Sequence, residues 1–424
     1  MLSKEDNERL TRTGPGTPMG NVFRRYWLPA LLASEVPPSD GAPIRRRLLG
    51  EDLVVFRDTN GKIGLVDAYC PHRRAPMFLA RNEKCGLRCV YHGWKFDTDG
   101  KCLEVPTEPK DSAYKDKIRI KSYPVWEGGG MIWAYMGPPA DRPPPPDMEL
   151  VRAPSTHRFV SRTVQDCNYL QALEGGLDSA HATILHNVTI GDLSFLDNFE
   201  ATTPRLDAQL TDYGFQYSGI RDAKGRKWVR VYQYIMPATQ LRARTVPVRG
   251  ETEPPKIPVI SGHYWVPIDD VTVSVFNFCY SADPNIALTR EFVQASEADY
   301  GRGPDDLLPD LRLKKSGRND YLIDRDLQRT RTFTGIVGIN TQDVAVQEGM
   351  GPIADRSEEH LGSTDRAIVM MRRLLLEATR QVEAGAPPRG ADSASYRGLR
   401  AVDHYADSEA QIPELIAREL VARF

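Results

Sequence analysis

Two short cysteine–histidine pairs in this sequence could hold a metal. In "CPHRR", Cys70 and His72 are separated by one residue, and in "CVYHGW", Cys89 and His92 are separated by two. Zinc accepts two cysteines and two histidines in a tetrahedron, but the common zinc fingers pair cysteine with cysteine and histidine with histidine. Mixed pairs suit a [2Fe–2S] cluster in which both cysteines bind one iron and both histidines bind the other. The pattern favours the cluster and leaves zinc as the alternative.

Two further cysteines flank this group. Cys85 could compete as a ligand through its Cys-x3-Cys spacing to Cys89, and Cys102 follows downstream. We expect both Cys85 and Cys102 to be small buried hydrophobic side chains, because free cysteine is among the most buried residue types.

A separate histidine pair lies in "DSAHATILH", after a predicted helix whose middle is weakened by Gly175 and Gly176. Asp178 and His181 are three residues apart and would share one helix face. His181 and His186 are five apart, about 500° of rotation on a regular helix, so the helix must end or distort between them if both bind one ion. The spacing alone leaves open whether these histidines bind a metal or are ordinary hydrogen-bonded side chains.

The elements that carry these residues differ in type. From about residue 45 to 135, short β-rich runs alternate with turns such as "DTNGK" and "FDTDGKC", which predicts a small all-β domain around both cysteine–histidine pairs. Four consecutive prolines at 143–146 favour an extended connection between domains. Beyond residue 155, strand-like and helix-like segments alternate, and a long amphipathic helix is predicted with Thr364 as its N-cap and Gly385 as its stop. The predicted fold class is α+β.

Length and composition restrict the class of protein. The chain has 424 residues, enough for two or three domains, and 55 basic against 57 acidic residues give a net charge of −2, so nothing points to nucleic acid. The N-terminus is charged from its fourth residue and does not resemble a signal peptide. The apolar stretch "YWLPALLA" is far shorter than the roughly 20 residues of a membrane helix. We expect a cytoplasmic protein whose clustered cysteines bind metal instead of forming disulfides.

Both cysteine–histidine loops resemble the Rieske [2Fe–2S] domain, whose pattern reads roughly C-x-H-R-G and then C-x-Y-H-G-W-x-F. The chain has "CPHRRAPMFLA" and "CVYHGWKFD". Tyr91, Gly93, Trp94 and Phe96 match this pattern outside the ligands, whereas Arg74 stands where glycine is common. The D-x2-H-x4-H spacing that follows resembles the signature of Rieske non-heme iron oxygenases.

This resemblance implies a division of the chain. Residues 1–44 would be an N-terminal segment that packs on the catalytic domain, 45–138 the all-β Rieske domain, 139–155 a proline-rich linker, and 156–424 the catalytic domain. The catalytic domain would have a helix-grip-like α+β fold with an antiparallel sheet.

The resemblance also implies the metal ligands. The cluster ligands would be Cys70, His72, Cys89 and His92. His181 and His186 would bind mononuclear Fe(II) in a 2-His-1-carboxylate facial triad, which leaves one face open for O2. The segment "GINTQDVAVQE" offers Asp343 as the carboxylate, with Glu348 as the alternative.

Asp178 would then have a bridging role. In the family this acid links a histidine of the iron site, here His181, to a Rieske histidine of the neighbouring subunit, here His92 of the partner subunit. Such a carboxylate fixes the orientation of both imidazoles, and the arrangement requires a homotrimer or a stacked hexamer. Glu174, one helical turn earlier, could assist or be a solvated acid.

Two longer stretches, "LTRTGPGTPMGNVFRRYWLPA" and "PIADRSEEHLGSTDRAIVMMRRLLLEA", look like phthalate dioxygenases and their relatives that act on chlorobenzoates and phenoxybenzoates. Their substrates are mostly aromatic carboxylates, and arginine suits bidentate recognition of a carboxylate. We expect Arg244 to bind it, with Ser179 as a hydroxyl donor, and Arg242 would share a strand face with Arg244. Phe276 and Phe278 would share a face of another strand and either fill the core or line a pocket.

The implied function is the oxygenase component of a multicomponent dioxygenase. A separate NAD(P)H-dependent flavin and iron–sulfur reductase would supply electrons, because the chain has no nucleotide-binding glycine fingerprint. With O2, the enzyme would cis-dihydroxylate a phthalate-like or substituted benzoate ring. The alternatives are O-demethylation or diaryl-ether cleavage and, more remotely, a Rieske electron carrier, which would explain only the all-β region.

Overall fold

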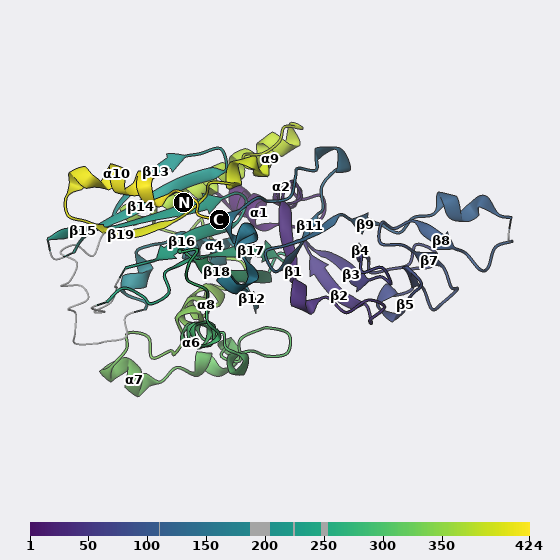
Figure 1. The fold of residues 1–424 in the computed structure, drawn as a ribbon, viewed down its shortest axis with the longest axis horizontal. Helices are drawn as coiled ribbons and strands as arrows, with labels where there is room; N and C mark the ends of the chain where they lie inside the picture. The colour runs from purple at the N-terminus through teal and green to yellow at the C-terminus, as the bar shows by residue number, and fades with distance from the viewer. Residues whose placement is uncertain (110, 187–203, 224, 247–252) are drawn as a thin grey trace.

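The molecule has a smaller and a larger lobe (Figure 1). The computed structural model describes residues 1–109, 111–186, 204–223, 225–246 and 253–424. Strands β2 to β9 build the smaller lobe, and both chain termini lie in the larger one.

Two antiparallel sheets form the smaller lobe. The first has the order β2-β3-β4-β9, with the bounds Ile44–Leu48, Glu51–Arg57, Ile63–Asp67 and Ser122–Tyr123. The second has the order β5-β6-β7-β8, with the bounds Arg81–Glu83, Gly86–Arg88, Lys95–Phe96 and Cys102–Glu104. A separate hydrophobic core fills this lobe and includes Cys70, Cys89 and Trp94. The prediction of a small all-β unit around the cysteine–histidine pairs is confirmed.

A three-stranded sheet connects the two lobes. Strand β1 (Trp27–Leu32), from the N-terminal segment, pairs with β11 (Met131–Tyr135), which also pairs with β10 (Val125–Gly128). The N-terminal helices α1 (Lys4–Thr11) and α2 (Pro18–Phe23) pack against the larger lobe.

An eight-stranded antiparallel sheet is the framework of the larger lobe. Its order is β12-β18-β17-β16-β15-β14-β13, and β19 pairs with β15. The strand bounds are Arg158–Gln165 (β12), Arg205–Leu210 (β13), Gly214–Ala223 (β14), Arg226–Ile235 (β15), Thr239–Arg244 (β16), Val259–Pro267 (β17), Val273–Ser281 (β18) and Val402–Ala406 (β19). Helices join this sheet to complete the predicted α+β class.

Helices lie on opposite sides of this sheet (Figure 1). On one side are α6 (Arg290–Tyr300), α7 (Arg325–Thr330) and α8 (Ile339–Gly349). On the other side are α9 (Arg366–Glu383) and α10 (Ile412–Glu419). Along the described ranges, none of the helices combines the length and the apolar character needed to cross a bilayer.

The ends of α9 agree with the sequence prediction in part. Thr364 is not its N-cap, because Thr364 lies in a 3-10 turn, Ser363–Asp365, and Asp365 holds the capping position. Gly385 follows the helix with a φ of +79°, the left-handed conformation that commonly ends a helix.

Helix α4 (Tyr169–Leu177) runs through the core between the sheet and α8. A Cβ atom on Gly175 would lie 2.3 Å from Nε2 of Gln347 in α8, and one on Gly176 would lie 2.2 Å from the ring of Trp265 in β17. The two glycines therefore allow close packing on both sides, and α4 continues through them. The helix ends at Leu177, before His181 and His186.

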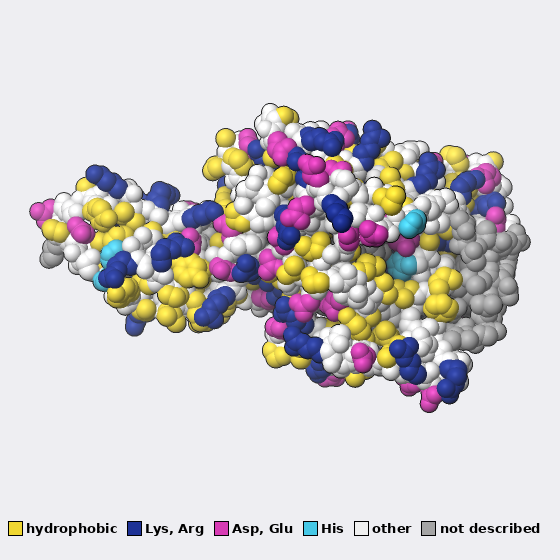
Figure 2. All heavy atoms as spheres, turned by 180° about the vertical axis from the view of Figure 1, so that it is seen from behind, with side chains coloured by type: hydrophobic (Ala, Val, Ile, Leu, Met, Phe, Trp, Pro, Cys, Tyr) yellow, Lys and Arg dark blue, Asp and Glu magenta, His cyan; other side chains and the backbone are white. Residues whose placement is uncertain are grey.

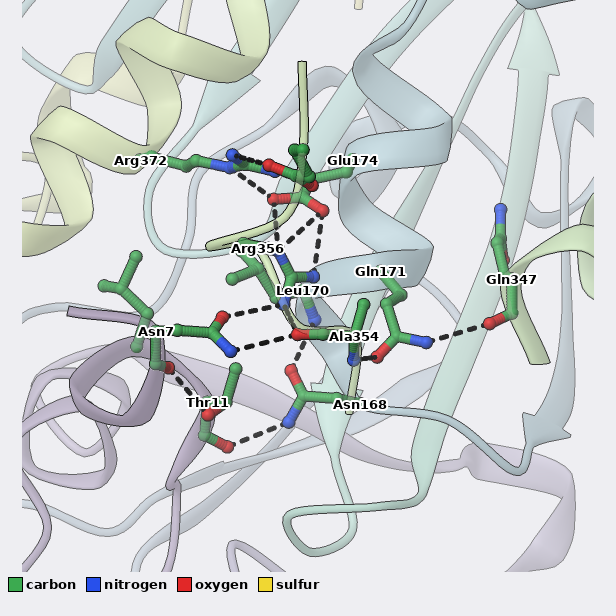
Figure 3. A network of polar contacts seen from close by, with 12 residues as sticks. Asn7, Thr11, Asn168, Leu170, Gln171, Glu174, Gln347, Ala354, Arg356 and Arg372 are labelled. Carbon is green, nitrogen blue, oxygen red and sulfur yellow. Dashed lines mark hydrogen bonds and ion pairs between the residues drawn. The ribbon is translucent and has the colours of Figure 1, made fainter. Parts of the chain in front are cut away.

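A buried polar network holds α4 in place (Figure 3). The Glu174 carboxylate accepts hydrogen bonds from Arg356 at 2.9 and 3.0 Å and from Arg372 at 2.6 Å. At the start of the helix, Asn168 Nδ2 donates to the carbonyl of Thr11, 2.8 Å away. Glu174 is thus neither a solvated acid nor a helper of Asp178, because its side chain anchors α4 to two buried arginines.

Candidate metal centres and substrate cavity

The two cysteine–histidine loops have the same backbone geometry. The N–H of Arg74 donates to the carbonyl of Cys70 at 2.9 Å, and the N–H of Gly93 donates to the carbonyl of Cys89 at 3.0 Å. Arg74 has a φ of +58° and Gly93 a φ of +74°. Arg74 therefore makes the same left-handed turn that its glycine counterpart makes.

The side chains of these loops divide into an inner cysteine pair and an outer histidine pair. Cys70 and Cys89 are 1% and 3% exposed, and the rings of His72 and His92 have centroids 4.5 Å apart. Nδ1 of His92 is buried without a hydrogen-bond partner in the described chain. Burial, together with the nearby Cys89, raises the pKa of the Cys70 thiol to about 11, so a thiolate there needs a bound cation.

This arrangement fits a two-metal cluster better than a single zinc ion. An inner cysteine pair and an outer histidine pair match two irons that have different ligands.

The other two cysteines of this lobe do not complete the site. Cys102 is 1% exposed and lies in the core, as expected. Cys85 is only partly buried, and its Sγ accepts a hydrogen bond from Nδ2 of Asn60 at 3.2 Å. The expectation that Cys85 is a buried hydrophobic residue is therefore wrong.

His181, His186 and Asp343 converge beside α4. His181 begins a short 3-10 turn, His181–Thr183, and Asp343 projects from α8. Oδ1 of Asp343 lies 3.3 Å from Nε2 of each histidine, and one ligand atom from each residue lies within 4.8 Å of the other two. Two imidazoles and one carboxylate on one side of a point have the composition of a facial triad.

Glu348, the alternative carboxylate, lies in the same helix but makes other contacts. Its oxygens accept from the N–H of Asp166 and the hydroxyl of Tyr321, each at 3.0 Å. These contacts hold Glu348 in a separate polar cluster.

Neighbouring polar groups orient the three converging side chains. Oε1 of Gln342 lies 2.7 Å from Nδ1 of His186, and Nδ2 of Asn340 donates to Oδ2 of Asp343 at 3.3 Å. Oδ2 of Asp178 lies 3.6 Å from Nδ1 of His181. No pattern in the sequence singled out Gln342 and Asn340, although both lie within three residues of Asp343 in "INTQD".

The electrostatics of this group favour a bound cation. Burial opposes the charged form of His181, but hydrogen bonds to Asp178 and Asp343 overcome it and raise its pKa to about 10. Burial likewise opposes the Asp343 carboxylate, yet His181 and His186 hold its pKa well below its usual range. Two carboxylates thus stabilise positive charge at this point, and the residues present fit a divalent metal.

A cavity of about 320 Å³ adjoins the triad and contains all the proposed substrate residues at its wall. Ser179, Arg242 and Arg244 line it. Arg244 is exposed at the end of β16, whereas Nε of Arg242 donates to Oγ of Ser261 at 3.3 Å. Of the phenylalanine pair, both are buried in the main core and Phe278 also borders the cavity.

Comparison with known proteins agrees with this geometry. Residues 26–124 match the Rieske [2Fe-2S] domain, and residues 134–404 match the family described as LigXa C-terminal domain like. The second match spans more than half of the chain. The chain is a member of the Rieske non-heme iron oxygenases.

Individual relatives extend over nearly the full length of this Rieske oxygenase. The chain is 38% identical to the phthalate 4,5-dioxygenase oxygenase subunit of Pseudomonas putida, over 91% of the chain and 88% of that protein. It is 36% identical to the 3-chlorobenzoate-3,4-dioxygenase oxygenase subunit of Comamonas testosteroni, over 93% of each. It is 35% identical to the 5,5'-dehydrodivanillate O-demethylase oxygenase subunit of Sphingobium sp. (strain NBRC 103272 / SYK-6), over 92% of the chain and 83% of that protein.

The resemblance seen in the sequence is therefore confirmed. The chain is an oxygenase subunit of the Rieske aromatic oxygenases and uses a [2Fe–2S] cluster and a mononuclear iron. A protein of this kind is an enzyme, so the alternative of a simple electron carrier is excluded.

Proposed function

We propose that this oxygenase cis-dihydroxylates an aromatic carboxylate of the phthalate or substituted benzoate type, with O2 and electrons from an NAD(P)H-dependent reductase. The observation that carries the proposal is the triad of His181, His186 and Asp343 at the wall of a cavity that also exposes arginine side chains. Relatives named for phthalate and 3-chlorobenzoate support the same substrate class.

In this proposal each metal has its own ligand set. The cluster is held by Cys70, His72, Cys89 and His92. The mononuclear iron is held by His181, His186 and Asp343. When bound, the cluster supplies single electrons and the iron supplies O2 activation.

The chain's own residues position the substrate and the ligands. Gln342 and Asn340 fix the imidazole of His186 and the carboxylate of Asp343. Arg244 and Ser179, at the cavity wall, are our predicted contacts for the substrate carboxylate. A ring held in one orientation beside the triad selects which carbon reacts.

The arrangement of subunits is also part of the proposal. Within one chain, the second sheet of the smaller lobe lies away from α4 and α8, which are inside the larger lobe (Figure 1). Asp178 contacts His181 and would bridge to His92 of the partner subunit in a homotrimer or stacked hexamer. Histidine side chains reach the surface of the smaller lobe among hydrophobic and basic ones, which suits docking of another protein (Figure 2).

The test is a turnover experiment with the oxygenase, a Rieske-type reductase, NADH and 18O2. The substrates offered are phthalate, isophthalate, terephthalate, 3-chlorobenzoate, 3-phenoxybenzoate and a methoxybenzoate, and the products are weighed by mass spectrometry. Two labelled oxygen atoms in a dihydrodiol of a benzene carboxylate would support the proposal.

Other products would identify a different reaction. One labelled atom with release of formaldehyde would identify an O-demethylase, the activity named for the dehydrodivanillate relative. Release of a phenol from 3-phenoxybenzoate would identify ether cleavage. No incorporation into any carboxylate, with a reducible cluster and bound iron, would contradict the substrate class.

A further inference from the structure

Arg221, in β14, is a buried arginine whose charge has no carboxylate partner in the described chain. Its side chain is 3% exposed. Nη2 donates to the carbonyl of Ser179 at 2.8 Å, whereas Nε and Nη1 are buried without a hydrogen-bond partner. Tyr232 and the Asp178 carboxylate lie in the neighbourhood of this guanidinium, but neither forms an ion pair with it, and a neutral phenol does not compensate a positive charge.

Most other buried arginines of the described chain are paired with acids. Examples are Arg162 with Glu35, Arg356 with Glu174, and Arg400 with Glu149. Burial of an unpaired charge is strongly unfavourable, so an unpaired guanidinium in a cavity indicates an anion that arrives from solution. Burial lowers the pKa of Arg221 in the free protein, as expected for such a group.

Arg221 faces the cavity next to the iron triad. Both Arg221 and Ser179 line this cavity, and Ser179 directly follows Asp178, the neighbour of His181. Oγ of Ser179 is a second buried polar atom without a hydrogen-bond partner in the described residues.

The two side chains meet over Gly219, two residues before Arg221 on the same face of β14. A Cβ atom on Gly219 would lie 3.5 Å from Nη1 of Arg221 and 3.5 Å from Oγ of Ser179. The missing side chain leaves both donors accessible from the same space. Nη1 of the guanidinium and the hydroxyl are two donors that match the two oxygens of a carboxylate.

We propose that the substrate carboxylate accepts hydrogen bonds from Nη1 of Arg221 and from Oγ of Ser179. This inference rests on the proposed function and specifies its anchoring site. Arg244 also lines the cavity but is exposed at the end of β16, whereas Arg221 is buried. Arg221 is the positioning residue that sets which ring carbon faces the triad.

The experiment measures binding instead of turnover. Calorimetric titration of the iron-loaded oxygenase uses phthalate, 3-chlorobenzoate and the neutral analogue 3-chlorobenzamide. Arg221→Gln is expected to weaken binding of the carboxylates by about 30-fold or more, since truncating one partner of a buried charge pair removes most of its contribution. Binding of the amide is expected to change by less than about 3-fold. The matched control is Arg226→Gln, because Arg226 is exposed in β15 and pairs with Asp407.

Thermal unfolding provides a second measurement. A carboxylate ligand is expected to raise the Tm of the wild type and not that of Arg221→Gln. If Arg221→Gln does not fold, Arg221→Lys and Ser179→Ala take its place. Each is expected to weaken carboxylate binding without affecting the amide, and a failure of both to do so would overturn the inference.

Two negative results are distinguishable. If the wild type binds the carboxylates and Arg221→Gln binds them equally well, the anchoring site is wrong while the proposed function stands. If the wild type binds none of the carboxylates, the proposed substrate class and the anchoring site both fall.

Discussion

Nδ1 of His186 lies 2.7 Å from Oε1 of Gln342, the residue that precedes Asp343 in α8. Nε2 of Gln342 donates to the carbonyl of Ile336 at 2.8 Å, which leaves its Oε1 as the acceptor for His186. A neutral imidazole of His186 would therefore carry its proton on Nδ1, which leaves Nε2 as the atom that would bind a metal beside Asp343. One helix thus supplies a carboxylate to the triad and the amide that orients its neighbour.

Replacement of Gln342 by Met is expected to lower the affinity for Fe(II) by about 10- to 100-fold, because the partner that fixes the ring and tautomer of His186 is lost. Titration of Fe(II) into protein that keeps its cluster but lacks the mononuclear iron measures this directly, and the absorption spectrum of the cluster should not change. Gln381→Met in α9, where the amide contacts Glu377, is the control. Unchanged iron affinity in Gln342→Met would show that His186 needs no such partner.

Arg74 and Gly93 occupy equivalent positions in the two cysteine–histidine loops, so substitutions at the two positions can be compared directly. Gly93→Ala is expected to destabilise the smaller lobe by about 1–2 kcal/mol, because φ is +74° and the new Cβ would lie 3.1 Å from Cγ of Pro106. Arg74→Ala is expected to cost less than about 1 kcal/mol, since that position already carries a Cβ atom and its ion pair with Asp67 is exposed. Loss of cluster absorbance during thermal unfolding measures both. Equal effects of the two substitutions would show that the positive φ and the close contact with Pro106 do not make Gly93 the more sensitive position.

The sequence predicted the side chains that converge beside α4 better than the residues that support them. Mixed cysteine–histidine pairs and the D-x2-H-x4-H spacing are local patterns, and the side chains of His181 and His186 do meet once α4 ends at Leu177. Gln342 and Arg221 contact their partners only through the tertiary fold, so no local pattern identifies them.

The same limit applies to the buried acids of this protein. The spacing along the helix suggests that Glu174 assists Asp178 or is solvated. Its actual partners, Arg356 and Arg372, lie about 180 and 200 residues away in sequence. In a chain with 26% charged residues, sequence alone does not say which acid meets which arginine. Pairing across such separations is decided by how the helices pack on the sheet.

Substitution of Glu174 by Gln is expected to destabilise the larger lobe by about 3–5 kcal/mol, because it leaves buried guanidinium charge unpaired. Arg356 is fully buried and shares this carboxylate with Arg372, which has Glu359 as a second partner. Urea unfolding followed by tryptophan fluorescence measures the change. Glu8→Gln, which breaks an exposed pair with Arg12, should change the stability by less than about 1 kcal/mol. A similar small effect for Glu174→Gln would show that the network in Figure 3 contributes little.

The stability of the contact between the lobes is expected to depend on pH through Glu51 in β3. Burial opposes its charge, but hydrogen bonds from Arg24, Lys121 and Tyr123 overcome this and lower its pKa below the ordinary 4.5. A carboxyl whose folded-state pKa is depressed contributes stability above its unfolded-state pKa, and the contribution disappears as the pH falls through the folded-state value.

The test compares the wild type with Glu51→Gln. At pH 7 the variant is expected to be less stable by about 1.5–3 kcal/mol, the range for hydrogen bonds to a charged group. The difference should shrink as the pH is lowered from 4.5, because the wild-type carboxyl then becomes neutral as well. Urea unfolding across this range gives the difference at each pH, and Glu127→Gln, at an exposed pair with Arg57, controls for general acid effects. A difference that stays constant down to the acid limit would show that Glu51 acts through packing and not through its charge.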